Sequence, residues 1–99
     1  MARIELAPEI RGDFDRILDH LAAHAVEDAP GRIREIIQAI EVLRHIPIIG
    51  RPVSAIITRD LVIVRSTRGY VALYRYIEQI DTVLVLAIRS QREAGYAST

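Results

Sequence analysis

The stretch from Gly69 to Tyr96 constrains the fold more than any other part of the chain, because it holds two apolar segments separated by a short polar turn. The segments are 70–78 and 82–90. Consecutive strands joined by so short a turn must run antiparallel. Both segments carry apolar residues at odd and even positions, which is typical of central strands or of strands whose second face is covered. The stretch therefore predicts the core hairpin of a sheet, followed by a polar tail.

The first half of the chain predicts a strand and two helices. Residues 2–7 alternate between apolar and polar types and precede Pro8, which suits the first turn of a helix. In 8–25 and again in 30–46, apolar side chains recur three and four positions apart, as on one face of a helix. The short joint between these segments predicts an antiparallel helical hairpin, whose two apolar stripes need a common surface to pack on.

The remaining segments complete the sheet. Residues 53–57 are a short strand or the approach to one, and Leu61–Arg65 is a further strand that ends at a turn. Helices and strands thus occupy separate parts of the chain, which favours an α+β fold of order β-α-α-β-β-β, with three or four strands after the helices. We expect an antiparallel sheet with the helical hairpin on one face. A chain of 99 residues supports one core, so residues 1–99 form a single domain.

Composition excludes several classes of protein. The chain has no cysteine and therefore no disulfides or thiolate metal sites. It shows neither a signal peptide nor an apolar run near the ~20 residues that cross a bilayer. We therefore expect a soluble, cytoplasmic protein without membrane contact. Hydrophobic residues make up 51% of the chain, which indicates either a well-filled core or a surface that a partner covers.

Charge is divided unevenly along the chain, although the net charge is zero. Residues 1–49 carry six Arg against nine acidic residues, and residues 50–99 carry seven Arg against four. The second half is thus the side that would meet an anion. Every basic residue is Arg, the residue that suits phosphates and carboxylates. For most of them we prefer a codon bias as the interpretation.

The order of these elements, together with several short phrases, resembles the RelE/ParE superfamily of bacterial toxins. The phrases are IELAPEI and FDRI at the start, GRPV after the second helix, DLVIVRSTRGYVALYRY in the middle and DTVLVLAIRSQREAGY at the end. The resemblance covers nearly the whole chain and implies a toxin of a type II toxin–antitoxin or plasmid-stabilisation module. It also implies that a cognate antitoxin binds and silences the toxin, and that operator DNA is reached only through the antitoxin.

The resemblance leaves two activities open. RelE-like members cleave mRNA in the ribosome with lysines before the turn, an arginine just after a Gly-Tyr pair, and arginine plus tyrosine in the tail. Such groups could transfer protons and stabilise the phosphorane charge. Here the corresponding strand positions hold Leu61, Ile63 and Val71, which can do neither.

The apolar residues favour the ParE-like branch, whose members are DNA gyrase inhibitors that act by binding rather than by catalysis. A RelE-like, ribosome-dependent mRNA endonuclease is one alternative. A low-toxicity partner in an antitoxin–operator complex is another. We expect no cofactor for any of these functions.

Target-binding candidates are basic and aromatic residues of the tail and of the preceding turn: Arg89, Arg92, Tyr96, Arg65 and Arg68. The tail residues match the family's tail, where they could bind a phosphate or an acidic patch of the target. A solvated strand end is the alternative. Arg65 and Arg68 lie at the turn, and for Arg68 exposure to solvent is the simpler interpretation.

Three tyrosines share one face of the first long strand: Tyr70, Tyr74 and Tyr76. They predict a partner interface or a cap on the core. Aromatic rows can also stack bases, which we consider the weaker alternative.

Polar residues of the first helix are expected to lie on its surface. Glu9 and Asp13 lie near the positive end of the helix dipole, and Arg16 is assigned to the polar face. His20 and His24 have the spacing of a metal-binding pair, but no third ligand is evident, so we expect no metal site.

Overall fold

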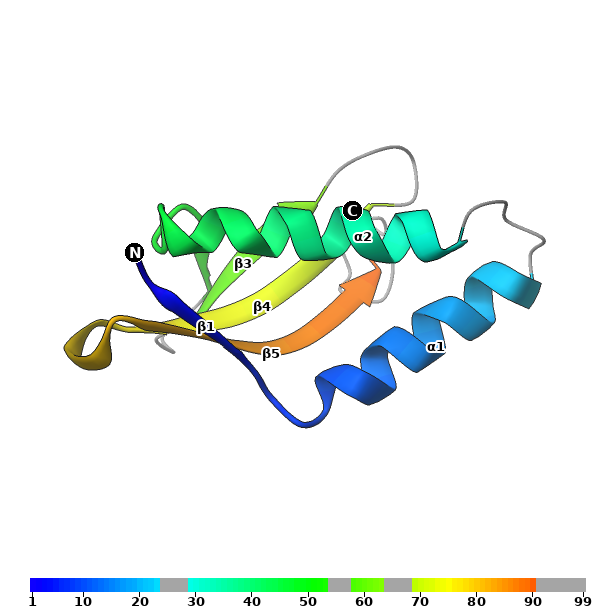
Figure 1. Ribbon diagram of the computed structural model, residues 1–99, viewed down its shortest axis with the longest axis horizontal. Coiled ribbons are helices and arrows are strands. Elements are labelled where there is room, and N and C mark those ends of the chain that lie inside the picture. Colours follow the sequence, from blue (N-terminus) through cyan, green and yellow to red (C-terminus); the bar gives the residue numbers. More distant parts are fainter. Residues whose placement is uncertain (24–28, 54–57, 64–68, 91–99) are drawn as a thin grey trace.

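A computed structural model describes residues 1–23, 29–53, 58–63 and 69–90. Seven regular elements and two single 3₁₀ turns follow one another along this part of the chain (Figure 1). They are β1 (Arg3–Leu6), α1 (Ile10–Ala23), α2 (Ala29–Glu41), η1 (Val42–Arg44), β2 (Arg51–Val53), β3 (Thr58–Ile63), β4 (Tyr70–Ile77), η2 (Glu78–Ile80) and β5 (Thr82–Ser90). The predicted core hairpin is confirmed as β4, η2 and β5.

The five strands form one sheet in the order β1-β5-β4-β3-β2. The predicted α+β class is confirmed. The sheet is antiparallel from β2 through β5, as expected, but the expectation was wrong for β1, which runs parallel to β5. Tight turns fix the direction of neighbouring strands, whereas β1 and β5 are joined only through the rest of the chain. The predicted strand at 53–57 begins earlier, at Arg51, and 54–57 lies outside the described residues.

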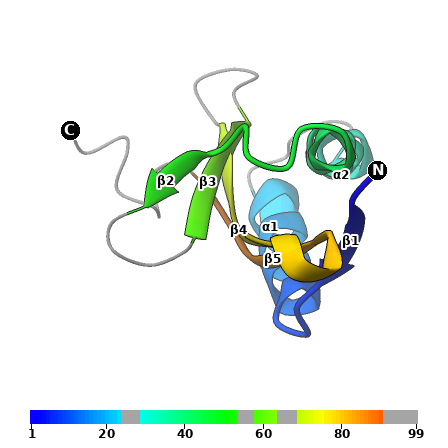
Figure 2. The same ribbon diagram turned by 90° about the vertical axis from the view of Figure 1, so that its left-hand side faces the viewer.

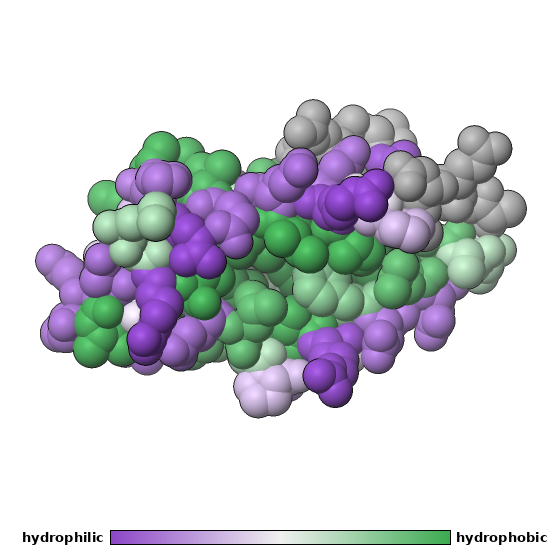
Figure 3. All heavy atoms as spheres, viewed as in Figure 1, coloured by the Kyte–Doolittle hydropathy of each residue, from purple (hydrophilic) through white to green (hydrophobic). Residues whose placement is uncertain are grey.

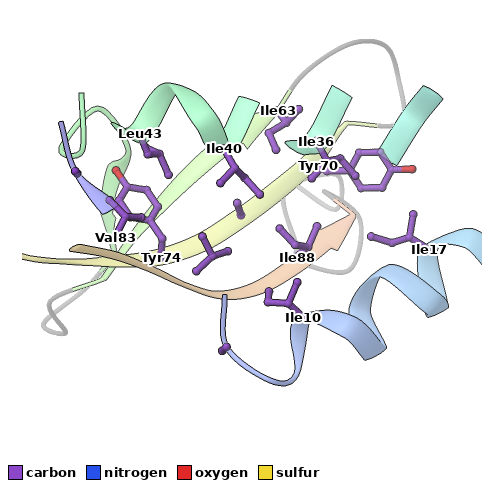
Figure 4. Packing of buried hydrophobic residues seen from close by; sticks show 14 of the residues in the cluster. Ile10, Ile17, Ile36, Ile40, Leu43, Ile63, Tyr70, Tyr74, Val83 and Ile88 are labelled. Atoms are coloured by element: carbon purple, nitrogen blue, oxygen red, sulfur yellow. The ribbon is translucent and has the colours of Figure 1, made fainter. Parts of the chain in front are cut away.

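Both helices bury their apolar stripes against one face of the sheet (Figures 1 and 2). The α1 helix begins two residues after Pro8, and the Ile10 N–H donates to the carbonyl of Ala7 over 3.0 Å. The core between helices and sheet contains, among others, Ile10, Ile17, Ile36, Ile40, Leu43, Ile63, Tyr70, Tyr74, Val83 and Ile88 (Figure 4). The predicted helical hairpin on one face is therefore confirmed.

An irregularity in β5 keeps both halves of that strand facing the core. Tyr74 is opposite Val85, but Leu73 is opposite Ala87, so Leu86 is an extra residue on the β5 side. Such a bulge reverses the alternation of side chains beyond it. Val85 and Ile88 consequently both point into the core although they are three positions apart.

The loop between η1 and β2 is fastened to the sheet by side chains. The hydroxyl of Tyr74 accepts a hydrogen bond from the buried N–H of Gly50 over 2.8 Å. Nη1 of Arg59 donates to the carbonyls of Ile48, at 3.1 Å, and of Gly50, at 2.8 Å. The loop therefore has a fixed course, which the family-like phrase GRPV alone did not reveal.

Candidate functional site

The outer edge of β5 is closed by side chains of α1 where β1 ends. The β1 strand pairs with β5 as far as Val85, whose carbonyl accepts the N–H of Ala7 over 2.8 Å. Further along, the N–H of Ile88 donates to Oδ2 of Asp13 over 2.9 Å, and the carbonyl of Ile88 accepts from Nη2 of Arg16 over 3.1 Å. These two side chains therefore take the place of a neighbouring strand and protect an open sheet edge.

The same carboxylate binds the side chain of the next residue in β5. Oδ1 of Asp13 accepts from Nη1 of Arg16 at 3.0 Å and from Nη1 of Arg89 at 2.8 Å. Asp13 is only 6% exposed, and a buried charge is tolerated only when it is paired and hydrogen-bonded. We call this cluster of Asp13, Arg16, Ile88 and Arg89 the β5 clamp.

The protonation state of the β5 clamp follows from these contacts. Burial raises the pKa of Asp13, but the hydrogen bonds from the Ile88 N–H and from the guanidinium groups of Arg16 and Arg89 outweigh it. The pKa of Asp13 consequently lies below its ordinary value, and the carboxylate is charged at neutral pH. One negative charge therefore faces two positive charges in this cluster.

Of the predicted target-binding residues, the structure describes Arg89, whose side chain is 46% exposed. Arg92, Tyr96, Arg65 and Arg68 lie outside the described residues.

Sequence reasoning missed the contact of Arg89 with Asp13 and the contact of Arg16 with the same carboxylate. Asp13 had been placed at the helix dipole and Arg16 on the polar face. The available signal was the position of Asp13, which is three residues after Ile10 and four before Ile17, on the buried stripe of α1.

Two of the three tyrosines of β4 lie in the core. Tyr74 is fully buried, and Tyr70 is also a core residue, so the predicted role as a cap on the core applies to both. Burial raises the pKa of Tyr74, although the hydrogen bond from Gly50 opposes this effect. Tyr76 is half-buried, and its hydroxyl donates to Asp81 over 2.6 Å.

The positions at which RelE-like members carry catalytic groups are apolar and covered. Ile63 and Val71 are buried, and Leu61 packs half-buried against the core. Within the described ranges, no group of three His, Asp or Glu residues could hold a metal ion. His20 is exposed, and His24 lies outside the described residues.

Several large apolar side chains are exposed to solvent. They are Met1, Leu6, Ile37, Val42, Ile46, Ile48, Ile49, Val62 and Ile80. Figure 3 shows an apolar band along the middle of one face, with hydrophilic side chains on either side. Exposed apolar surface of this kind commonly marks a binding site for another protein.

In the described part of the chain, no helix has the length and apolarity needed to span a bilayer.

Comparison with known families identifies the fold. A model of the ParE toxin of the type II toxin–antitoxin system parDE matches residues 4–95. The chain belongs to this ParE toxin family. It is thus a ParE toxin of a type II toxin–antitoxin system, and the resemblance to the ParE-like branch is confirmed.

Solved structures share the fold of this ParE toxin, and two of them illustrate the similarity. A chain of the chromosomal ParDE TA system from P. aeruginosa superimposes with a TM-score of 0.72 at 20% sequence identity, covering 91% of this chain and 96% of that chain. A chain of the intact E. coli RelBE toxin–antitoxin complex gives a TM-score of 0.54 at 14% identity, covering 90% and 95%. None of the curated proteins is a significant match by sequence.

Proposed function

We propose that this ParE toxin inhibits DNA gyrase by binding it, without catalysing a reaction. The observation that carries the proposal is the apolar character of the strands at which an RNase would need polar groups. Ile63 and Val71 are buried and Leu61 is half-buried, so none of them can bind a phosphate or transfer a proton. A binding protein needs no such set of groups.

The proposed contact with the target lies at the end of β5. Arg89 is half-exposed and held in the β5 clamp, and Arg92 and Tyr96 follow it in the tail. Arg65 and Arg68 are proposed to extend this basic edge. A guanidinium group at a protein surface suits a carboxylate or phosphate of the target.

A cognate antitoxin is the proposed partner that neutralises the toxin. Both structural neighbours come from toxin–antitoxin systems, which supports such a partner. The exposed apolar side chains and the apolar band of Figure 3 supply surface that an antitoxin would remove from water. We propose that operator DNA is reached only through the antitoxin.

The test begins with expression of the chain alone in bacteria. Growth arrest is expected, followed by impaired gyrase supercoiling and intact mRNA. Cleavage of ribosome-bound mRNA with normal supercoiling would instead establish the nuclease alternative. Normal growth at high soluble expression would favour the low-toxicity partner of an antitoxin–operator complex.

The contact residues are tested by the double variant Arg89→Ala with Arg92→Ala. We expect it to weaken growth inhibition while the protein keeps its fold, as judged by circular dichroism. Arg11→Ala is the matched control, because Arg11 is an exposed arginine on α1. Undiminished toxicity of the double variant would place the target contact elsewhere.

A further inference from the structure

The position of Arg89 is set by a residue at the opposite end of the sequence. We propose that Asp13 is a positioning residue of this toxin, which holds the guanidinium of Arg89 where it meets the target. The inference rests on the proposed function of Arg89 as a target contact. Asp13 itself is buried and does not touch the target in this proposal.

Asp13 fixes Arg89 through the backbone and through the side chain. Oδ2 accepts the N–H of Ile88, the residue before Arg89, and Oδ1 accepts Nη1 of Arg89 itself. These bonds span 75 and 76 positions of sequence, so they fasten α1 to the end of β5. A free arginine side chain loses much rotamer entropy on binding, and fixing it beforehand lowers that cost.

The β5 clamp leaves the guanidinium of Arg89 accessible to an acidic group of the target. Oδ1 of Asp13 accepts from both Arg16 and Arg89, so Arg89 does not hold the carboxylate alone. The side chain of Arg89 is 46% exposed. The cluster therefore holds the guanidinium in place without removing it from the surface.

A role confined to stability is the competing explanation, because Asp13 also accepts a hydrogen bond from the backbone N–H of Ile88 at the edge of β5. The variant Asp13→Asn separates the two roles. An asparagine oxygen can still accept the N–H of Ile88, and its NH₂ group then faces Arg89 and cannot bind it. The backbone bond is kept in this variant, whereas the hold on the guanidinium is lost.

The first measurement is the side-chain Nη–H signal of Arg89, the group that binds Asp13. The full chain is made by cell-free synthesis with ¹⁵N-arginine, and the signal is assigned by its loss in Arg89→Ala. In the wild type we expect a dispersed signal with slow solvent exchange. In Asp13→Asn it should move to the region of exposed arginines and exchange about tenfold faster, the factor that corresponds to one charge-assisted hydrogen bond. The control Asp15→Asn, an exposed acid of the same helix, should leave it unchanged. An unchanged signal in Asp13→Asn overturns the inference.

If Asp13→Asn does not fold, Asp13→Ser replaces it, since serine also offers an acceptor near Ile88. The conservative variant Asp13→Glu keeps the carboxylate and should retain more of the protection of Arg89 than either neutral variant. Equal loss of protection in Asp13→Glu and in the neutral variant would show that charge is not what holds Arg89, and would overturn the inference.

The second measurement is toxicity, as the inducer concentration that halves the growth rate. Asp13→Asn and Arg89→Ala should each raise it about tenfold, and the double variant should match Arg89→Ala alone. A further tenfold rise in the double variant means that Asp13 acts independently of Arg89, which overturns the inference. If Arg89→Ala stays fully toxic, the proposed function of Arg89 fails and the inference fails with it. If Arg89→Ala loses toxicity while Asp13→Asn keeps it, only the positioning role fails.

Discussion

Replacement of Gly50 by alanine is the sharpest test of how the loop before β2 is held. A Cβ atom at Gly50 would lie 2.6 Å from Cε1 and Oη of Tyr74 and 2.9 Å from Cζ. Non-bonded carbon atoms do not approach so closely, so either the ring or the loop must move. Tyr74 is fully buried, which leaves the ring no space to give way without disturbing the core.

The cost can be worked out from two contributions. Overpacking a filled core costs about 1–3 kcal/mol. Displacement of the loop also breaks the buried bond between the Gly50 N–H and the Tyr74 hydroxyl, and an unpaired buried group costs about 1–3 kcal/mol. We therefore expect a loss of about 2–6 kcal/mol in the free energy of unfolding. For a domain of this size, even the lower figure lowers Tm by about 10 °C.

The assay is thermal and urea unfolding followed by circular dichroism. Gly12→Ala is the matched control, because a Cβ at Gly12 meets nothing within 4 Å and alanine favours a helix by about 1 kcal/mol. This control should raise Tm. In a Tyr74→Phe background, Gly50→Ala should cost less than in the wild type, since the hydrogen bond is already gone. A Gly50→Ala protein within about 1 kcal/mol of the wild type would refute the reasoning.

Three further predictions concern the core and two titrating groups. Ile36→Ala should lower the free energy of unfolding by about 2–5 kcal/mol, because Ile36 is fully buried. Ile37→Ala should change it little, because Ile37 is 45% exposed. Urea unfolding of the two variants measures the difference. The charged Asp13 carboxylate should contribute to the free energy of unfolding above about pH 4, the ordinary range of an aspartate, and this contribution should be lost as pH falls through its lowered pKa. The difference in Tm between wild type and Asp13→Asn should therefore become smaller in acid. A hydrogen bond to Asp81 raises the pKa of Tyr76, so Asp81→Asn should lower that pKa, which NMR of the Tyr76 ring measures; an unchanged pKa would contradict this cause.

Local features of the fold were predictable from sequence because local patterns determine them. The apolar segments on either side of Gln79–Asp81 place β4 and β5 correctly, and the stripe in 8–25 places α1 within two residues at each end. Features set by distant partners were not predictable. The parallel pairing of β1 depends on a strand at the other end of the chain, and no turn signals its direction.

The candidate site was predictable only in part for the same reason. Arg89 stands out as a basic residue at a strand end, but its partner Asp13 is 76 positions away. Asp13 accepts the N–H of Ile88, which β1 does not reach because that strand ends at Leu6. No pattern within α1 reveals this contact. The bulge at Leu86 likewise could not be predicted, because β5 contains no glycine or proline that would indicate it.

The pairing of β1 with β5 also has a consequence for the timing of biosynthesis. Arg3 is opposite Thr82, and Asp13 binds Arg89, so the first strand and the first helix acquire these partners only when the last strand has been made. Contacts between such distant parts of a chain form late in folding. A nascent chain whose β5 has not yet left the ribosome has neither a complete sheet nor a fixed Arg89. We therefore expect toxicity to require that β5 has left the ribosome and paired with β1.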